Sequence, residues 1–202
     1  MTTPPAARIG SLISMKLIHR SSLLLAACLV ACSRAVAADP SFSVQVPGAD
    51  KLSITPLAGW THTTDRPPAG IPPTVDFTAP GGTVIKITFM PDAKKQFATA
   101  EELDKLVTKA NQQYVANSVE KRVSLVRLPT SSGPGVYSTF SDPKLVNVAK
   151  PPAGDFRYVS SGAISVGRQL LIFSLLSNSR DNDEYRQALD FLVKGISVAG
   201  GS

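Results

Sequence analysis

Residues 156–177 read FRYVSSGAISVGRQLLIFSLLS, and this stretch decides the fold. Two long apolar-rich runs, residues 156–166 and 169–177, are separated by Gly167-Arg168. Glycine in the first position of a two-residue connection is typical of a tight β-hairpin. The second run is apolar at both odd and even positions, which predicts a central strand covered on both faces. We therefore expect an antiparallel sheet that lies between two layers.

Shorter runs of alternating apolar residues predict further strands around this hairpin. The turn Pro80-Gly81-Gly82 joins two of them into a second hairpin. Proline clusters at residues 66–73 and 150–154 are expected to be surface connections, because proline lacks the N–H group that a sheet interior needs. The further predicted strands cover residues 42–46, 52–55, 61–64, 74–79, 83–90, 122–128 and 135–140.

Two segments have helical periodicity instead. Thr99 and Glu102 form a capping box ahead of apolar residues at helical spacing, which predicts a helix at residues 100–119. A second helix is predicted to begin near residues 181–183, with an apolar stripe that extends to Ile196 and with Gly195 placed to stop it. The order strands, helix, strands, helix predicts an α+β fold in which helices pack on an antiparallel sheet.

The amino-terminal 38 residues have the three-part layout of a bacterial secretory signal. A basic stretch begins at Met15, an apolar run covers residues 21–31, and small residues precede Asp39. We expect Met15 to be the true start of the protein. The apolar run is shorter than the roughly 20 residues that a helix needs to cross a bilayer. One α+β domain is expected at residues 39–202.

Two processing routes for the signal remain open. Val36-Ala37-Ala38 fits cleavage before Asp39. The segment Leu29-Val30-Ala31-Cys32 resembles a lipoprotein processing site, at which Cys32 would carry lipid, and residues 25–28 match that pattern too. The protein is therefore expected in the periplasm, either free or held at the outer membrane by lipid on Cys32.

Composition excludes several classes of function. Both cysteines, Cys28 and Cys32, lie in the signal, so the domain has no internal disulfide and no thiolate metal site. The chain carries a net charge of +6, but residues 1–38 hold four of its basic residues and none of its acidic ones, which leaves +2. That balance is too small for a nucleic-acid-binding domain, which is expected to show a basic stripe.

The order of elements and a few residues resemble a known group. Residues 54–60 read ITPLAGW, residues 167–173 read GRQLLIF, and a last helix ends in Phe191-Leu192. Together they resemble the PsbP/Mog-like α/β/α sandwich superfamily, which includes exported bacterial proteins of the DcrB type, over roughly residues 41–198. The resemblance implies the sandwich fold and a non-enzymatic accessory or binding role. No metal-binding or partner-binding motif of the group maps onto this chain.

Trp60, His62 and Arg66 are the candidates for contact with a ligand or partner. Trp60 could line a pocket, although a large ring beside a glycine is more often a core residue. His62 could act as the base of a small hydrolase, but no serine sits in a Gly-x-Ser-x-Gly elbow, and a polar position on an edge strand explains this histidine as well. Arg66 opens a proline-rich loop, and loops carry most recognition.

The sequence predicts a binding function rather than catalysis. The acidic run at residues 181–184 is interpreted as a helix N-terminus and not as a metal site, and no cofactor is expected. We therefore expect a non-catalytic accessory protein of the cell envelope that binds an envelope protein or a small ligand. Two alternatives are a periplasmic hydrolase that uses His62 and a chaperone-like binder of apolar segments, which would need a contiguous exposed apolar patch.

Overall fold

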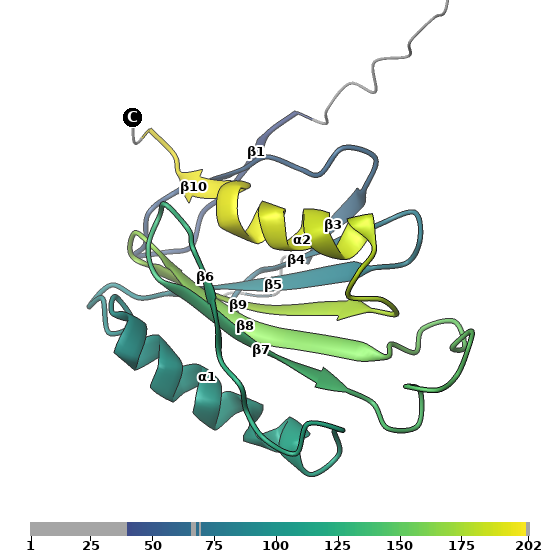
Figure 1. Ribbon diagram of the computed structural model, residues 1–202. Coiled ribbons are helices and arrows are strands. Elements are labelled where there is room, and N and C mark those ends of the chain that lie inside the picture. Colours follow the sequence, from purple (N-terminus) through teal and green to yellow (C-terminus); the bar gives the residue numbers. More distant parts are fainter. Residues whose placement is uncertain (1–39, 66–67, 69, 201–202) are drawn as a thin grey trace, which may run out of the picture. The chain divides into compact units, whose positions relative to one another are not determined.

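A computed structural model describes residues 40–65, 68 and 70–200, and Figure 1 shows the arrangement of the elements. The predicted signal with Cys32, as well as Arg66, lies outside the described residues. The described residues form ten strands and two helices. In chain order these are β1 (Phe42–Val44), β2 (Leu52–Ile54), β3 (Thr61–Asp65), β4 (Thr74–Thr78), β5 (Val84–Pro91), α1 (Ala100–Val115), β6 (Val126–Leu128), β7 (Gly135–Ser141), β8 (Tyr158–Val166), β9 (Gln169–Ser177), α2 (Asp183–Lys194) and β10 (Ile196–Val198).

Seven strands form one antiparallel sheet in the order β3-β4-β5-β9-β8-β7-β6. The strand that the sequence identified as central, β9, is the fourth of the seven. It pairs with β8 through the predicted turn, with Val166 opposite Gln169, and Gly167 there has a φ of 60°. Only glycine adopts this backbone conformation without steric cost, which explains the tight reversal at this point.

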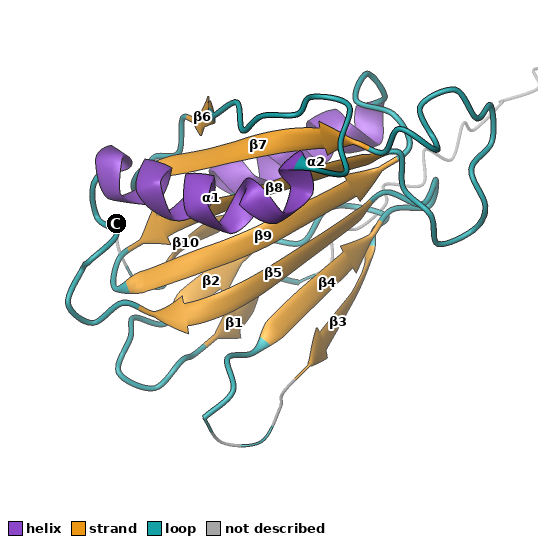
Figure 2. Ribbon diagram, turned by 90° about the horizontal axis from the view of Figure 1, so that it is seen from below, coloured by secondary structure: helices purple, strands orange, loops and turns teal. Residues whose placement is uncertain are grey.

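Helices lie on opposite faces of this sheet, as Figures 1 and 2 show. Successive side chains of a strand point to opposite faces, so β9 serves two cores. Leu170 faces α1 with Leu103 and Val107, and Leu171 faces α2. The core on the α2 side is the larger one and includes Phe77, Ile85, Ile87, Phe89, Phe173, Phe191 and Leu192. These layers make the fold α+β, as predicted.

A small second sheet, β1-β2-β10, shares the α2 side with that helix. The sequence did not predict β10, and the assignment of Ile196 to the helical stripe was wrong. The helix ends at Lys194, Gly195 caps it, and the chain continues as a strand that places Ile196 opposite Ile54. Ile196 is buried in either arrangement, so its apolar character did not distinguish helix from strand.

The first helix begins as predicted and ends earlier. The Thr99 hydroxyl accepts from the Glu102 N–H, and the Glu102 carboxylate accepts from the Thr99 N–H, both at 3.3 Å, which completes the capping box. The helix stops at Val115, four residues before the predicted end, because the Ser118 hydroxyl donates to the Val115 carbonyl and Lys121 turns the chain with a φ of 54°. Neither described helix is long and apolar enough to cross a membrane.

Candidate binding site

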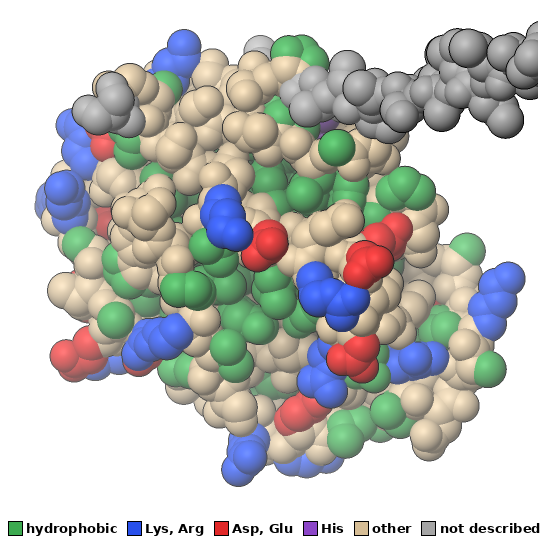
Figure 3. Space-filling model, turned by 45° about the horizontal axis from the view of Figure 1, so that its top comes forward, with side chains coloured by type: hydrophobic (Ala, Val, Ile, Leu, Met, Phe, Trp, Pro, Cys, Tyr) green, Lys and Arg blue, Asp and Glu red, His purple; other side chains and the backbone are tan. Residues whose placement is uncertain are grey.

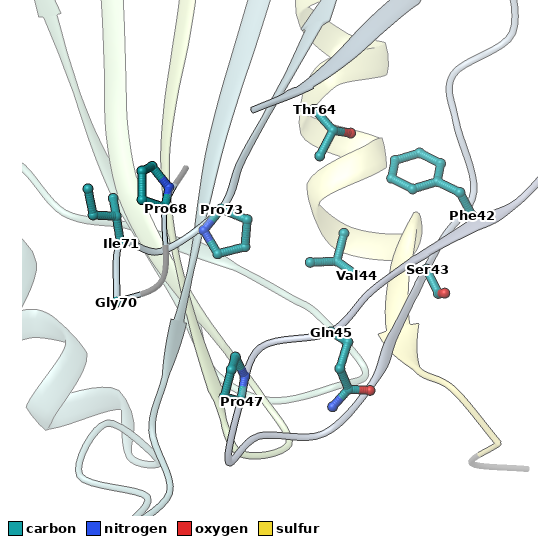
Figure 4. A pocket seen from close by; sticks show the side chains of 10 residues that line it. All are labelled: Phe42, Ser43, Val44, Gln45, Pro47, Thr64, Pro68, Gly70, Ile71 and Pro73. Atoms are coloured by element: carbon teal, nitrogen blue, oxygen red, sulfur yellow. The ribbon is translucent and has the colours of Figure 1, made fainter. Parts of the chain in front are cut away.

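A pocket of about 400 Å³ lies between β1 and the connection from β3 to β4 (Figure 4). One wall is β1 with the residues that follow it, and the other is the proline-rich connection. No charged side chain is among the described residues that line it. The lining residues are Phe42, Ser43, Val44, Gln45, Pro47, Thr64, Pro68, Gly70, Ile71 and Pro73.

The β1 wall is the edge of a strand rather than one of its faces. Four consecutive residues, from Phe42 to Gln45, line the pocket. Because side chains alternate between the two faces of a strand, consecutive residues share a pocket only where it follows the strand edge. Figure 4 shows Phe42 and Val44 pointing to the side where Thr64 lies, and Ser43 and Gln45 pointing the other way.

The backbone of Ser43 faces this edge. In β2, the Thr55 N–H donates to Gly195 at 2.9 Å, and the Lys51 carbonyl accepts from Ala199 at 2.8 Å, so the odd-numbered residues face β10. The even-numbered residues of β2 consequently face β1, where they lie opposite Phe42 and Val44. Residues of an antiparallel strand alternate in direction, so the N–H and C=O of Ser43 point away from β2.

The opposite wall offers apolar surface and few hydrogen-bond donors. Pro68 and Pro73 have no N–H group. The Ile71 N–H donates to the Pro68 carbonyl at 3.2 Å, and Gly70 between them has a φ of 96°, so the chain reverses direction here. This turn leaves the Ile71 side chain 60% exposed at the rim. A further hollow of about 170 Å³ continues past Ile71 to Pro91.

His62 lies beside this pocket, behind Phe42. The two rings are stacked, with centroids 4.7 Å apart and planes inclined by 3°, and Phe77 lies 5.9 Å from the imidazole. Within the described residues, His62 has no hydrogen bond to a hydroxyl or a carboxylate. The arrangement makes His62 a flat support for Phe42 and does not provide the oriented base that a hydrolase needs.

Trp60 is placed in the core, two residues before His62. Its side chain is 3% exposed, and the indole N–H donates to the Gln187 side chain of α2 at 3.3 Å. In this position it connects β3 to α2 and does not line the pocket. The contact role predicted for Trp60 and His62 stays a prediction, as does that of Arg66.

The acidic run forms the start of α2, as the sequence indicated. Asn182 is the N-cap, whose side chain accepts from the Tyr185 N–H at 2.9 Å. The Glu184 carboxylate accepts from the Gly81 N–H at 2.6 Å and from the Thr83 N–H at 3.4 Å, which ties the helix to the β4–β5 turn. Among the described residues, no group of three or more His, Cys, Asp or Glu is placed to hold a metal ion.

The surface near α2 is mixed in charge. Figure 3 shows basic and acidic side chains interspersed on this face rather than gathered in separate patches. Lys194 pairs with Asp190 at 3.8 Å and Arg186 with Asp183 at 2.6 Å along the helix. A second hollow, about 410 Å³ in volume, lies between these charges and Leu57. Unlike the described lining of the pocket along β1, the lining of this hollow includes charged residues, Asp190 and Lys194.

Sequence analysis named the proline-rich loop after Arg66, which forms one wall of the pocket, but not the strand that forms the other wall. Phe42 and Ile71 were not singled out, although both line it. The available signal was the single large apolar residue, Ile71, in a loop that otherwise contains Arg66, proline, glycine and alanine. Loops carry much of a protein's recognition, so an apolar residue in such a connection is a candidate for ligand contact.

Comparison with known proteins bears on the fold alone. No protein-family model and no curated protein matches the sequence. The structure is similar to the solution structure of cyanobacterial PsbP (CyanoP) from Synechocystis sp. PCC 6803, with 13% identity and a TM-score of 0.45. The match covers 82% of this chain and 95% of that one.

Proposed function

We propose that the protein is an exported, non-catalytic binding protein of the cell envelope and that the pocket along β1 is its binding site. One observation carries this proposal: a pocket whose described lining residues are uncharged and largely apolar lies beside the edge of β1, which has no partner on that side among the described residues, and beside an exposed isoleucine. Its volume of about 400 Å³ lies within the range of about 300–1,000 Å³ that is usual for ligand sites.

The lining favours an uncharged ligand. Burial of an ion against Phe42, Val44 and Pro73 would remove water from it without an opposite charge among the described lining residues, and such desolvation is costly. Thr64 offers a hydroxyl group, and the outward N–H and C=O of Ser43 offer main-chain partners, to orient an uncharged polar group. The pocket thus combines apolar area for affinity with a few polar groups for specificity.

The two alternative functions have less support. A hydrolase that uses His62 would need that imidazole to reach a substrate, but Phe42 stacks on the ring. A chaperone-like binder would need a broad apolar patch. The large exposed apolar side chains are instead spread over separate elements: Ile71 at the pocket, Met90 in β5, Val126 in β6, and Val119 and Leu125 in the chain between α1 and β6.

Export is the part of the proposal that rests on residues 1–38. The test is the intact mass of the mature protein after expression of the natural gene, together with separation of membrane and soluble fractions. A mass that begins at Asp39 in the soluble fraction supports a free periplasmic protein. A mass that begins at Cys32 with acyl chains in the membrane fraction supports a lipoprotein. A mass that retains the signal in the cytoplasm contradicts export.

Binding is tested with a library of uncharged small molecules and short capped peptides, read by amide NMR shifts. Ligands are expected to shift the signals of Ser43, Thr64 and Ile71. An Ile71→Asp variant, which adds a charge at the rim, should bind these ligands with at least tenfold lower affinity. Ala153→Asp, which adds the same charge in another proline-rich loop, is the matched control. Ligands that map to the hollow between Leu57 and α2 would contradict this site.

A further inference from the structure

The edge of β1 indicates what class of partner the pocket takes. We infer that the partner is an extended, uncharged peptide segment of another protein, which adds as a fourth strand to the small sheet alongside β1. This inference rests on the proposed function, because it names the ligand of the same pocket. Extended peptides commonly bind by strand addition, with main-chain hydrogen bonds for affinity and side-chain pockets for specificity.

The first step is that β1 has hydrogen-bonding groups to offer. Among the described residues it pairs with β2 alone, and the N–H and C=O of Ser43 point away from that strand. The residues of β1 and the next residue, Gln45, also line the pocket. A ligand in the pocket therefore lies directly against main-chain groups that have no partner among the described residues.

The second step is that this edge lacks the protection seen at other edges of the molecule. Natural sheets shield edges with charges, proline or covering groups. At the far edge of the small sheet, the Ser132 hydroxyl donates to the outward carbonyl of Ile196 at 3.3 Å. At the β6 edge of the large sheet, Arg127 forms an ion pair with Asp104 of α1. The sequence of β1, Phe-Ser-Val, contains neither charge nor proline.

The third step is that the two walls differ in what they offer. Pro68 and Pro73 have no N–H group, so the strand edge is the natural partner for the backbone of a peptide. Alternate side chains of that peptide would point toward Val44, Thr64 and Ile71, where apolar groups fit. The four residues of the edge span about 13 Å at about 3.3 Å per residue, which suits a segment of four to six residues.

The experiment removes one main-chain donor without altering the pocket. Ser43→Pro deletes the outward N–H, and proline is tolerated at an edge strand when its nitrogen faces away from the sheet. Ser43→Ala keeps the N–H and is the control. The probe is a set of capped six-residue peptides in which threonine alternates with valine, isoleucine or leucine, and the readouts are affinity and amide NMR shifts.

We expect the best peptide to lose at least tenfold in affinity with Ser43→Pro and less than twofold with Ser43→Ala. Its alternately N-methylated form, which cannot donate those hydrogen bonds, should not bind the unaltered protein. This second measurement keeps the test valid if Ser43→Pro does not fold. Together these results would support strand addition.

Other outcomes separate this inference from the proposed function. Loss of binding with Ile71→Asp but not with Ser43→Pro or N-methylation would overturn strand addition and leave the binding site intact. Binding of uncharged small molecules but of no peptide would overturn the partner class in the same way. If sedimentation experiments show a dimer, and the Ser43→Pro substitution dissociates it, a second copy of this chain occupies the edge. This result would overturn the inference that the partner is a peptide of another protein. If no small molecule and no peptide binds in the pocket, both proposals are overturned.

Discussion

Two loops of this molecule contain the same four residues, Pro-Pro-Ala-Gly, at positions 67–70 and 151–154. The two loops share two backbone features, one at the glycine and one at the second proline. Gly70 and Gly154 have φ values of 96° and 88°. In each loop the residue after the glycine donates to the carbonyl of the second proline, at 3.2 Å in the first loop and 3.1 Å in the second. The local chemistry of proline and glycine therefore decides the turn in both places.

The residues that follow give the two loops different roles. In the second loop, Arg157 donates to the carbonyls of Leu145, Val148 and Asn178, the first and last at 3.1 and 3.0 Å. This guanidinium fastens the whole connection between β7 and β8 to the body of the protein. In the first loop, Ile71 follows the turn with its side chain exposed beside the pocket. The same four-residue sequence thus precedes an attachment residue in one loop and an exposed apolar residue in the other.

The largest effect is expected from removal of the fastening residue of the second loop. Arg157→Ala leaves three carbonyls without their charged donor and should lower the free energy of unfolding by about 2–4 kcal/mol. Urea unfolding followed by circular dichroism measures this. Hydrogen exchange should also become faster at residues 143–156 and remain unchanged at residues 70–73. Lys150→Ala is the control, and equal stability of the two variants would contradict the role given to Arg157.

Glycine substitutions compare the two turns directly. Gly70→Ala and Gly154→Ala each force a residue with a Cβ atom to a positive φ, where an added Cβ has open space but the backbone is strained. Each change should cost about 1 kcal/mol of stability. The two costs should be equal, whereas only Gly70→Ala should also weaken peptide binding. A clearly larger cost at one position would mean that the turns are not equivalent.

A smaller effect on stability is expected at the exposed isoleucine. Because Ile71 buries little surface, Ile71→Ser should change the free energy of unfolding by less than about 0.5 kcal/mol. The same variant should weaken binding in the pocket severalfold. A large loss of stability would instead make Ile71 a packing residue and would remove the contrast between the two loops.

The smallest effect on stability is expected at Glu120, which binds Ser141 where the connection from β7 to β8 begins, and this effect depends on pH. Burial acts to raise the pKa of Glu120, but the Ser141 hydroxyl and N–H, at 2.7 and 2.8 Å, outweigh it and hold the pKa below its usual 4.5. A lowered folded-state pKa stabilises the protein above the unfolded pKa, and this contribution disappears as pH falls through the folded value. The stability difference between the natural protein and Glu120→Gln should therefore shrink below pH 4.5. A difference that stays constant down to pH 3 would contradict this link.

Local patterns were sufficient to predict much of the fold. The capping box at Thr99 and the turn at Gly167 involve neighbours in sequence, and both are present in the structure. The second sheet was missed because it depends on Ile196–Val198 meeting Leu52–Ile54, which lie near opposite ends of the domain. The predicted strand at residues 122–128 shortened to Val126–Leu128, because the Ser124 N–H bonds to the Ser138 hydroxyl instead of to a backbone carbonyl.

The candidate site was harder to predict for the same reason. Its walls are a strand near residue 43 and a loop near residue 71, which come together only because the small sheet packs on the large one. Sequence reasoning pointed to His62, which supports Phe42 from behind, since a lone histidine is conspicuous in a sequence. Backbone groups that point away from a neighbouring strand, such as the N–H and C=O of Ser43, have no signature in residue identity, so the strand edge could not be recognised.

Trp60 gives the protein a built-in optical reporter. It is the sole tryptophan of the chain, it is almost fully buried, and its indole N–H is held by Gln187 of α2. Its fluorescence should therefore shift to longer wavelength when α2 detaches and water reaches the ring. Because Trp60 is absent from the lining of the pocket, ligand titrations should leave this emission nearly unchanged. Unfolding and binding can then be followed separately in one sample without a dye.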